Sequence, residues 1–419
     1  MTKNIVLLLF ASIAVSLTAS IFLRKSGSNF PQSLVPAKEW KIPPRPNSED
    51  PQVWLDWIRQ VQADYEEITN VLSHDPSQSG ICSEMSMKLG RITHDVEHRL
   101  LLIGPPSIQP CINQLFGGDH YGVAMTVLAN LGKRSVGPLT LAMHSNPESA
   151  KSAYDVFNFM KENASSELVE IACKPGDGRQ GAIDVLEYVA RTYEGRDEPI
   201  AIGRPDAFDE ALRPDLLQQL KKERNSTTRA QLAAIQRVFR SPDAAVIAEL
   251  CHLMKSDSSP EVQKAAAESL QQQMRDSSQK GSILILPSVA QVLTSKNDEE
   301  TIISCSEIVY YTKFPIDSKT INALRQAAKI ESQDHRINDY ALMALAHQAI
   351  YNQDCIPDML LALDSQCYPT ISTAADACIK LGPKAISADA KLREIMQHNT
   401  HGMSLKAQEA IVAISRHAK

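Results

Sequence analysis

Residues 256–274 decide the fold, and they read Ser-Asp-Ser-Ser-Pro-Glu-Val-Gln-Lys-Ala-Ala-Ala-Glu-Ser-Leu-Gln-Gln-Gln-Met. Ser258 or Ser259 can cap a helix that has Pro260 in its first turn, and Ser258 with Glu261 has the spacing of a capping box. Apolar residues then recur every four positions, at Val262, Ala266, Leu270 and Met274. Such a narrow apolar stripe cannot bury itself, so this helix is predicted to need helical neighbours.

The segment before this helix predicts its first partner. Residues 241–254 open with Ser241-Pro242-Asp243, which repeats the Ser-Pro-acid start. Apolar residues then share one helical face, at Val246, Ile247, Leu250 and Leu253. The two helices form a hairpin of about 35 residues, which is the length of a unit in a helical solenoid. The sequence therefore predicts an all-α fold of the α-solenoid class.

Related patterns recur along the chain, at residues 120–132, 178–186, 228–238, 261–270, 334–345 and 369–383. In the first of them, Leu131-Gly132 leads through three polar residues into Val136-Gly137-Pro138-Leu139. These stretches resemble the HEAT-repeat family, whose second helix typically follows an Asp, carries Val, Ala and Leu-Gly, and turns into a Val-Pro-x-Leu helix. The resemblance covers about residues 105–419 and implies a solenoid of HEAT-like hairpins. The copy at 298–310 departs from the pattern because it lacks the Ala and Gly positions.

Aligning the repeats predicts one inward-facing residue in each copy: Leu128, Val156, Leu186, Ile235, Leu270, Val309, Leu345, Cys378 and Ile411. The step between Leu186 and Ile235 is the longest, which marks an insertion at residues 194–225. Long insertions in solenoids project from one edge and often carry binding function. The basic run Lys221-Lys222-Glu223-Arg224 in this insertion is more typical of a solvated helix end than of a binding patch.

The chain begins with an uncharged apolar run at residues 5–23, long enough to cross a bilayer. Residues 1–25 are therefore predicted to be either a cleaved signal peptide or a single transmembrane anchor. Only Lys3 lies upstream, whereas Arg24, Lys25 and further basic residues lie downstream, which by the positive-inside rule keeps the C-terminal side in the cytoplasm. A short charged N-terminus before a long domain is also typical of exported proteins. We favour export and leave the side of the membrane open.

Residues 26–50 contain five prolines and a Ser-Gly-Ser start, which predicts an extended linker. Residues 51–104 are predicted to form an N-terminal helical cap, with helices at 51–72 and 81–103. The chain's three tryptophans lie in or just before this region, at Trp40, Trp54 and Trp57. We interpret them as covering the open end of the solenoid core, and an exposed aromatic binding patch is the alternative.

The composition narrows the function classes. A formal net charge of −6 provides no overall basic surface for a phosphate backbone, so nucleic acid is not expected as a partner. The eight cysteines include no Cys-x-x-Cys pair, and Cys251, Cys305 and Cys378 occupy apolar helical positions. Buried free thiols are therefore predicted, with a disulfide as the alternative if the protein is exported.

One motif raises the question of catalysis. His94-Asp95-Val96-Glu97-His98 matches His-x-x-Glu-His, in which two histidines on one helical face hold zinc and the glutamate acts as base. A third zinc ligand is required, and Glu167 or Glu170 are candidates by their place along the chain. The helical surroundings and the missing glycine-containing continuation argue against a peptidase. A zinc-dependent hydrolase using His94, Glu97 and His98 is therefore kept as the alternative function.

The leading hypothesis is a non-enzymatic, protein-binding scaffold, membrane-tethered or exported, that holds a protein partner along its helical surface or through residues 194–225. It assigns no catalytic, cofactor-binding or metal-binding residue and expects no cofactor. The membrane is a partner only if residues 5–23 are retained. A third hypothesis is a resemblance to the HEAT-like bilin lyases, in which helical repeats handle a chromophore; it implies a soluble protein, and residues 5–23 count against it.

Overall fold

The computed structural model describes residues 40–72, 79–117, 122–146, 150–160, 162–192, 210–239, 243–276, 279–295, 298–330, 336–398 and 402–415. These residues form α-helices, short 3₁₀ helices and connecting turns, and they contain no β-strand. The apolar run 5–23, most of the predicted linker and residues 194–209 of the predicted insertion lie outside them. No helix that the structure describes combines the length and apolar character needed to cross a membrane.

The chain divides into two compact units. The first contains Val61–Leu89 and the described residues before Arg45, and the second contains Arg45–Gln60 and Gly90–Lys419. Two of the three crossing points fall inside helices, α2 (Pro51–Leu72) and α3 (Ser79–Ile103), which match the two predicted N-terminal helices. In the first unit, Trp40 packs against Tyr65 and the ammonium of Lys88 lies over its ring.

The second unit contains two rows of alternating helices. The first row consists of α4 (Ile108–Phe116), α6 (Lys133–Ser145), α8 (Glu162–Cys173), α10 (Arg213–Lys222), α12 (Ala244–Ser256), α14 (Gln279–Leu293), α16 (Ser318–Ala327), α18 (Ile356–Ala362) and α20 (Asp389–His398). The second row consists of α5 (Gly122–Leu131), α7 (Ala150–Met160), α9 (Arg179–Thr192), α11 (Ser226–Ile235), α13 (Pro260–Asp276), α15 (Glu299–Tyr310), α17 (Arg336–Gln348), α19 (Tyr368–Leu381) and α21 (Ser404–Ser415).

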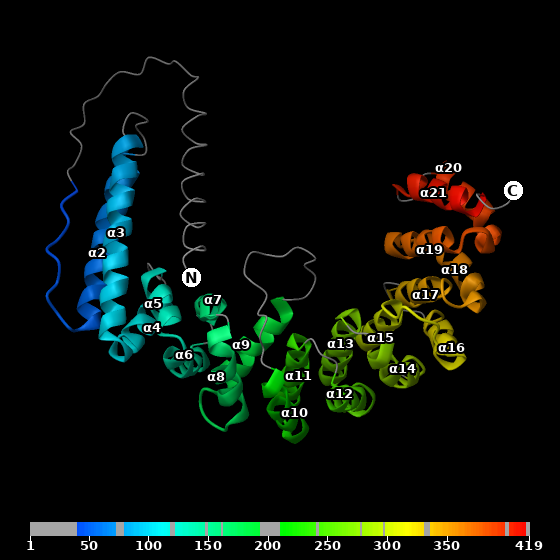
Figure 1. Ribbon diagram of the computed structural model, residues 1–419, viewed down its shortest axis with the longest axis horizontal. Helices are drawn as coiled ribbons and strands as arrows, with labels where there is room; N and C mark the ends of the chain where they lie inside the picture. The colour runs from blue at the N-terminus through cyan, green and yellow to red at the C-terminus, as the bar shows by residue number, and fades with distance from the viewer. Residues whose placement is uncertain are drawn as a thin grey trace, which may run out of the picture. The chain divides into compact units, whose positions relative to one another are not determined.

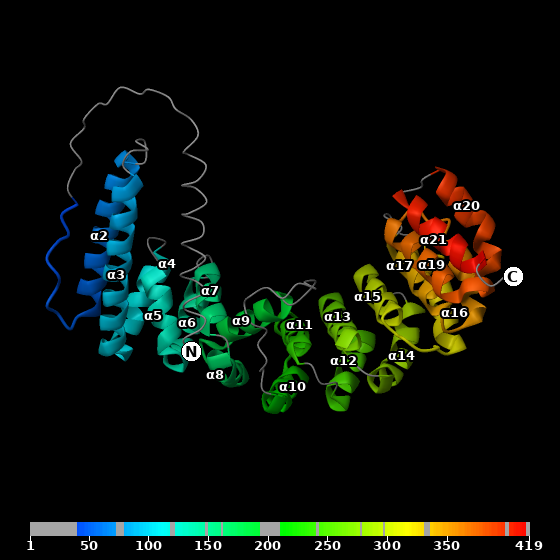
Figure 2. The ribbon, with the colours of Figure 1, turned by 45° about the horizontal axis from the view of Figure 1, so that its top comes forward.

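Each first-row helix packs against the second-row helix that follows it, which makes the hairpin unit. Each second-row helix also packs against the next one, from α5 through to α21. Figures 1 and 2 show α11, α13, α15 and α17 in succession on one side, and α10, α12, α14 and α16 on the other. The fold is therefore an α-solenoid, as the sequence predicted.

The predicted inward residues form the core of this stack. All are buried, and each lies on a different second-row helix: Leu128, Val156, Leu186, Ile235, Leu270, Val309, Leu345, Cys378 and Ile411. The apolar stripe of α13 is also buried, with Val262, Ala266 and Leu270 fully so. Burying a large aliphatic side chain contributes about 1.5–3 kcal/mol, so these positions together drive the stacking.

The helix starts differ in detail from those predicted. α12 begins at Ala244, and the carboxylate of Asp243 accepts hydrogen bonds from the N–H groups of Ala245 and Val246. α13 begins at Pro260, and Ser259 lies in the capping position, with its hydroxyl donating to Glu261 at 2.6 Å. The predicted Ser258–Glu261 capping box is therefore wrong, because Ser259 is the serine adjacent to the first helical residue.

Two glycines make the sharp turns at the start of the solenoid. Gly104 has φ 77° and ψ −134°, and Gly132 has φ 60° and ψ −134°, a conformation that only glycine adopts without strain. A serine follows each glycine by three residues, and its buried hydroxyl donates to a carbonyl of the preceding helix. Ser107 donates to Leu100 O and Ser135 to Leu128 O, both at 2.8 Å. The same turn is therefore built twice, one repeat apart.

The eight cysteines are free thiols. Cys251, Cys305 and Cys378 are buried, as predicted, and the Sγ of Cys305 lies 3.5 Å from the Sδ of Met254. Burial raises the pKa of Cys111 and of Cys378 to about 12. These thiols are therefore packing residues and not nucleophiles.

We expect Gly132→Ala to lower the free energy of unfolding by about 1–3 kcal/mol, because alanine is strained at this backbone conformation. A Cβ at Gly132 would meet no atom within 4 Å, so a steric clash cannot explain the loss. Gly90 lies inside α3 with similar open space and ordinary helical φ, so Gly90→Ala should stabilise by about 0.5–1 kcal/mol. Urea unfolding followed by circular dichroism measures the free energy of unfolding of both variants. Equal changes in the two would contradict the positive-φ turn at Gly132.

A buried charge links the 3₁₀ helix η6 (Gln236–Val238), which follows α11, to α13. The Arg237 side chain is 4% exposed and its guanidinium pairs with Glu268, which is 28% exposed. We expect Glu268→Gln to cost about 3 kcal/mol, because the buried guanidinium loses the carboxylate that pairs with it directly. The control is Asp389→Asn beside Arg393, a pair at 2.7 Å whose arginine is half exposed, where the loss should stay below about 1 kcal/mol. Thermal unfolding measures the loss of stability in both variants. Similar losses would show that the buried Arg237 does not need the Glu268 charge.

Candidate protein-interaction surface

The His-x-x-Glu-His motif lies in α3. His94 and His98 are exposed, whereas Glu97 is half-buried. Burial raises the pKa of Glu97, while a hydrogen bond with Thr126 of α5 and the nearby His94 act in the opposite direction. Val96 and Leu100 of the same helix are fully buried. The motif therefore lies on a helix that is packed through Val96 and Leu100. Its Glu97 contacts α5.

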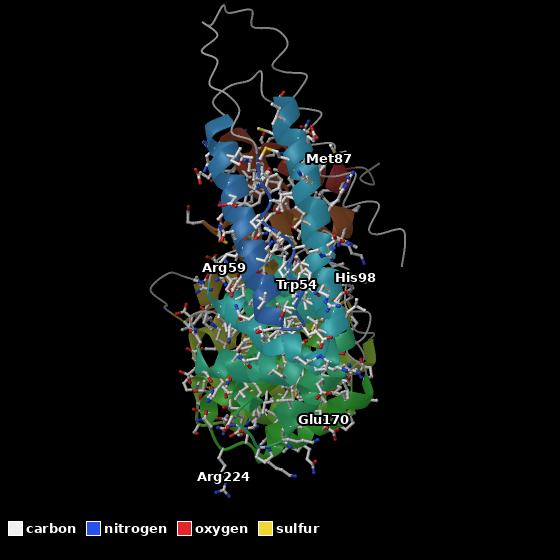
Figure 3. The ribbon with its side chains drawn as sticks, turned by 90° about the vertical axis from the view of Figure 1, so that its left-hand side faces the viewer. Trp54, Arg59, Met87, His98, Glu170 and Arg224 are labelled. Atoms are coloured by element: carbon white, nitrogen blue, oxygen red, sulfur yellow. The ribbon has the colours of Figure 1, made fainter. Side chains whose placement is uncertain are left out.

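The predicted third ligand does not join the motif. Glu167 and Glu170 lie in α8, and Figure 3 shows Glu170 in a different part of the second unit from His98. Glu170 pairs with Lys174. No three His, Cys, Asp or Glu side chains gather into a possible metal site within the part of the chain that the structure describes. The geometry gives no support to the zinc-hydrolase alternative.

The tryptophans are packing residues rather than an exposed patch. Trp40 and Trp54 are buried, and Trp57 meets Trp54 edge to face with centroids 6.1 Å apart. In the second unit, the Trp54 indole N–H donates to the Ser48 carbonyl at 2.8 Å, and the guanidiniums of Arg45 and Arg99 lie over its ring. We therefore set the aromatic-patch alternative aside for Trp40 and Trp54.

An ordered polar network lies on the second-row helices α9 and α11. The amide of Gln231 donates to Asp184 at 2.9 Å and to Glu187 at 2.7 Å. Gln180 donates to Asp184 and to the Gln231 carbonyl, both at 2.8 Å. Glu187 also accepts two hydrogen bonds from the exposed Arg191. These half-buried side chains are thus held in one arrangement while part of each stays accessible.

Two tyrosines extend this network to α7. The rings of Tyr154 and Tyr188 stack with centroids 4.2 Å apart and planes 11° apart. Burial raises the pKa of Tyr154, and the charges of Asp184 and Glu187 raise it further. The second row therefore presents aromatic faces next to fixed carboxylates, a combination suited to contacts with another protein.

Similar polar links join the next second-row helices. Gln271 of α13 donates to Glu307 of α15 at 2.9 Å, and Glu300 of α15 pairs with Arg336 of α17 at 2.6 Å. Asp376 of α19 pairs with Lys406 of α21 at 2.7 Å. Polar contacts therefore join second-row helices at most steps from α9 to α21. At the α17–α19 step, Asp339 of α17 accepts hydrogen bonds from the hydroxyls of Ser365 and Thr370.

The described end of the predicted insertion belongs to the solenoid. Residues 213–222 form α10, which packs against α8 and α11. The Glu223 carboxylate accepts a hydrogen bond from the Arg179 guanidinium of α9 at 2.8 Å. The Lys221 ammonium lies 3.8 Å from the Glu249 carboxylate. The predicted helix end at residues 221–224 is observed, and two of its four charged side chains are paired.

Sequence reasoning missed the surface formed by Tyr154, Asp184, Tyr188 and Gln231. Tyr154 and Tyr188 lie 34 positions apart, close to one repeat length, and each is two residues from a predicted core position. This periodic spacing was the available signal. The hydrogen bonds themselves depend on how α9 and α11 are rotated against each other, which the pattern does not specify.

We expect Asp184 and Gln231 to be energetically coupled. A double-mutant cycle with Asp184→Ala and Gln231→Ala should give a coupling energy of about 0.5–1.5 kcal/mol, because each variant removes the same hydrogen bond. A cycle that pairs Asp184→Ala with Gln218→Ala on the first-row helix α10 should be additive. Urea unfolding measures both cycles, and additivity in the first would show that the network is absent in solution.

Known proteins resemble this chain only in structure. No known protein family matches it, and no curated protein does. The solved structure of karyopherin Kap121p bound to the SUMO protease Ulp1p aligns with 88% of this chain at 11% identity and a TM-score of 0.44. The chain spans 45% of the length of that karyopherin. A structure of TOG domain arrays of microtubule polymerases aligns at 10% identity and a TM-score of 0.28. The alignment covers 78% of this chain and 84% of the chain in that structure.

Proposed function

We propose that this chain is a non-enzymatic scaffold of the HEAT-repeat type that holds a protein partner against its second-row helices. The observation that supports this most directly is the cross-linked polar surface from α9 to α21. A repeat protein that only needed stability could place bulky apolar or fully exposed polar residues there. Instead, half-buried carboxylates and amides are held there by hydrogen bonds, and two tyrosines are held by ring stacking.

Such a surface has an energetic advantage in binding. Association usually loses free energy through the ordering of interface side chains, about 0.5–1.5 kcal/mol for each rotamer-rich side chain. Gln231 and Asp184 are already ordered by their neighbours. A partner that binds them therefore costs little additional side-chain entropy. Neighbouring hairpins hold the second-row helices in register, so several of these groups can engage one extended partner.

The partner side of the scaffold can be mapped by photo-cross-linking. A photoreactive amino acid is placed in the full chain at the second-row positions Tyr188 and Tyr340, and at the exposed first-row positions Gln218 and Asn322 as controls. In cells that normally make the protein, we expect adducts with another polypeptide from the second-row positions only. Adducts from the first-row positions alone, or from none, would contradict the proposed function.

We also propose that residues 5–23 tether the scaffold to a membrane or direct its export. The support is the uncharged length of this run, since a charged residue at the centre of a spanning segment is costly. For the full chain we expect membrane association that resists alkaline carbonate, or secretion with loss of the N-terminus. Leu8→Arg with Val15→Arg should abolish either result, whereas two arginines at the exposed Gln218 and Asn322 should not. Unchanged fractionation of the first variant would contradict the tether.

A further inference from the structure

A cluster of rings gathers where α15 and α17 end. The Tyr310 ring lies 5.0 Å from the His347 ring and 5.1 Å from the Tyr311 ring, and His347 lies 5.6 Å from Tyr351, all between centroids. All four side chains are half-buried, so each keeps an accessible part. We call these four residues the ring cluster. Aromatic residues that are rigid and partly exposed are typical anchors in protein interfaces.

The ring cluster rests on a fixed base. Gln348 is fully buried, and its amide donates to the carbonyl of Val309 in the last turn of α15 and to that of Thr312 just after the helix. This side chain ties the last turn of α17 to the last turn of α15. The rings therefore project from two helix ends that are held in register.

Two lysines flank the ring cluster. Lys313 follows α15 and Lys380 lies in the last turn of α19; both are exposed. Burial, and then the positive charges of Lys380 and Lys313, lower the pKa of His347 to about 4, so the imidazole is neutral near pH 7 and the lysines supply the local charge. Among the described residues, no carboxylate forms an ion pair with either ammonium.

The acidic groups of these helices are engaged elsewhere. Glu307 accepts from Gln271 of α13, and Asp376 pairs with Lys406 of α21. The other charged side chains of α15 and α17 lie at the helix starts: Glu299, Glu300, Arg336 and Asp339. The end of the row therefore carries two uncompensated positive charges beside a set of aromatic faces.

We propose that the ring cluster with Lys313 and Lys380 docks an acidic segment of the protein partner, with carboxylates on the lysines and an apolar or aromatic side chain on the rings. This inference rests on the proposed function and names the chemistry of the partner. Charge complementarity selects the acidic segment. A nucleic acid fits less well, because two lysines offer few of the phosphate contacts on which its binding depends.

The experiment measures binding of a fluorescein-labelled synthetic peptide, in which glutamate pairs alternate with phenylalanine, to the full chain by fluorescence anisotropy. Wild-type protein should bind this peptide, and should bind it at least about tenfold more tightly than a peptide with lysine in place of glutamate. Lys313→Glu with Lys380→Glu should weaken binding about tenfold or more. Tyr351→Leu should weaken it less, because it removes one ring and no charge.

The matched control reverses two exposed lysines beside the same region. Lys319 lies on the first-row helix α16 and Lys329 follows it, so Lys319→Glu with Lys329→Glu makes the same change in net charge. This control should bind the glutamate peptide as wild type does. Equal weakening in both double variants, or no preference for the glutamate peptide, would overturn the proposal. Circular dichroism melts of all variants verify that the exposed substitutions leave the fold intact.

The two proposals fail in different ways. If Tyr188 still cross-links a partner while peptide binding ignores Lys313 and Lys380, the scaffold function stands and the acidic docking site is wrong. In the opposite case, the ring cluster binds the peptide selectively but no second-row position gives an adduct in cells. The acidic docking site is then supported and the scaffold function is contradicted.

Discussion

The stacking of each second-row helix on the next is the interaction on which the structure depends. Each helix carries one narrow apolar stripe, and no single hairpin can bury it. α13 illustrates the requirement, since it packs against α11 and α15 within its own row and against α12 within its hairpin. Ala265, Ala266 and Ala267 are all buried there, and small side chains allow close approach of the helices. Stability is therefore distributed over neighbour contacts and not concentrated in one core.

This distribution explains why polar contacts between neighbouring second-row helices recur along the solenoid. Once the apolar stripes bring two second-row helices together, polar residues at the edge of the stripe are partly desolvated and need partners. Gln231, Gln271 and Arg336 each reach a carboxylate on an adjacent second-row helix. The same side chains that satisfy this requirement also form the ordered surface that we propose for partner binding.

The chemistry on this surface changes along the row. Near α7 and α9 it combines the Tyr154–Tyr188 stack with Asp184 and Glu187. At the ends of α15 and α17 it combines four rings with lysines and a neutral histidine. A scaffold with different charges at different repeats can hold one partner in a defined direction, because reversing the partner would set like charges against each other.

The sequence by itself determined the all-α solenoid class, the helical hairpin at residues 241–274 and the inward residue of each repeat, because the 3.6-residue period and the capping residues act between neighbours along the chain. Asp243 and Pro260 begin their helices for such local reasons, although the choice between Ser258 and Ser259 required the structure. Only the tertiary structure decided which polar side chains meet. Tyr154 and Tyr188, or His347 and Tyr310, stand about one repeat apart, and their contact depends on how two helices are rotated and shifted against each other. The same reason separates His94 and His98 from Glu170: a ligand pattern within one helix is local, but its third member has to be brought by the fold.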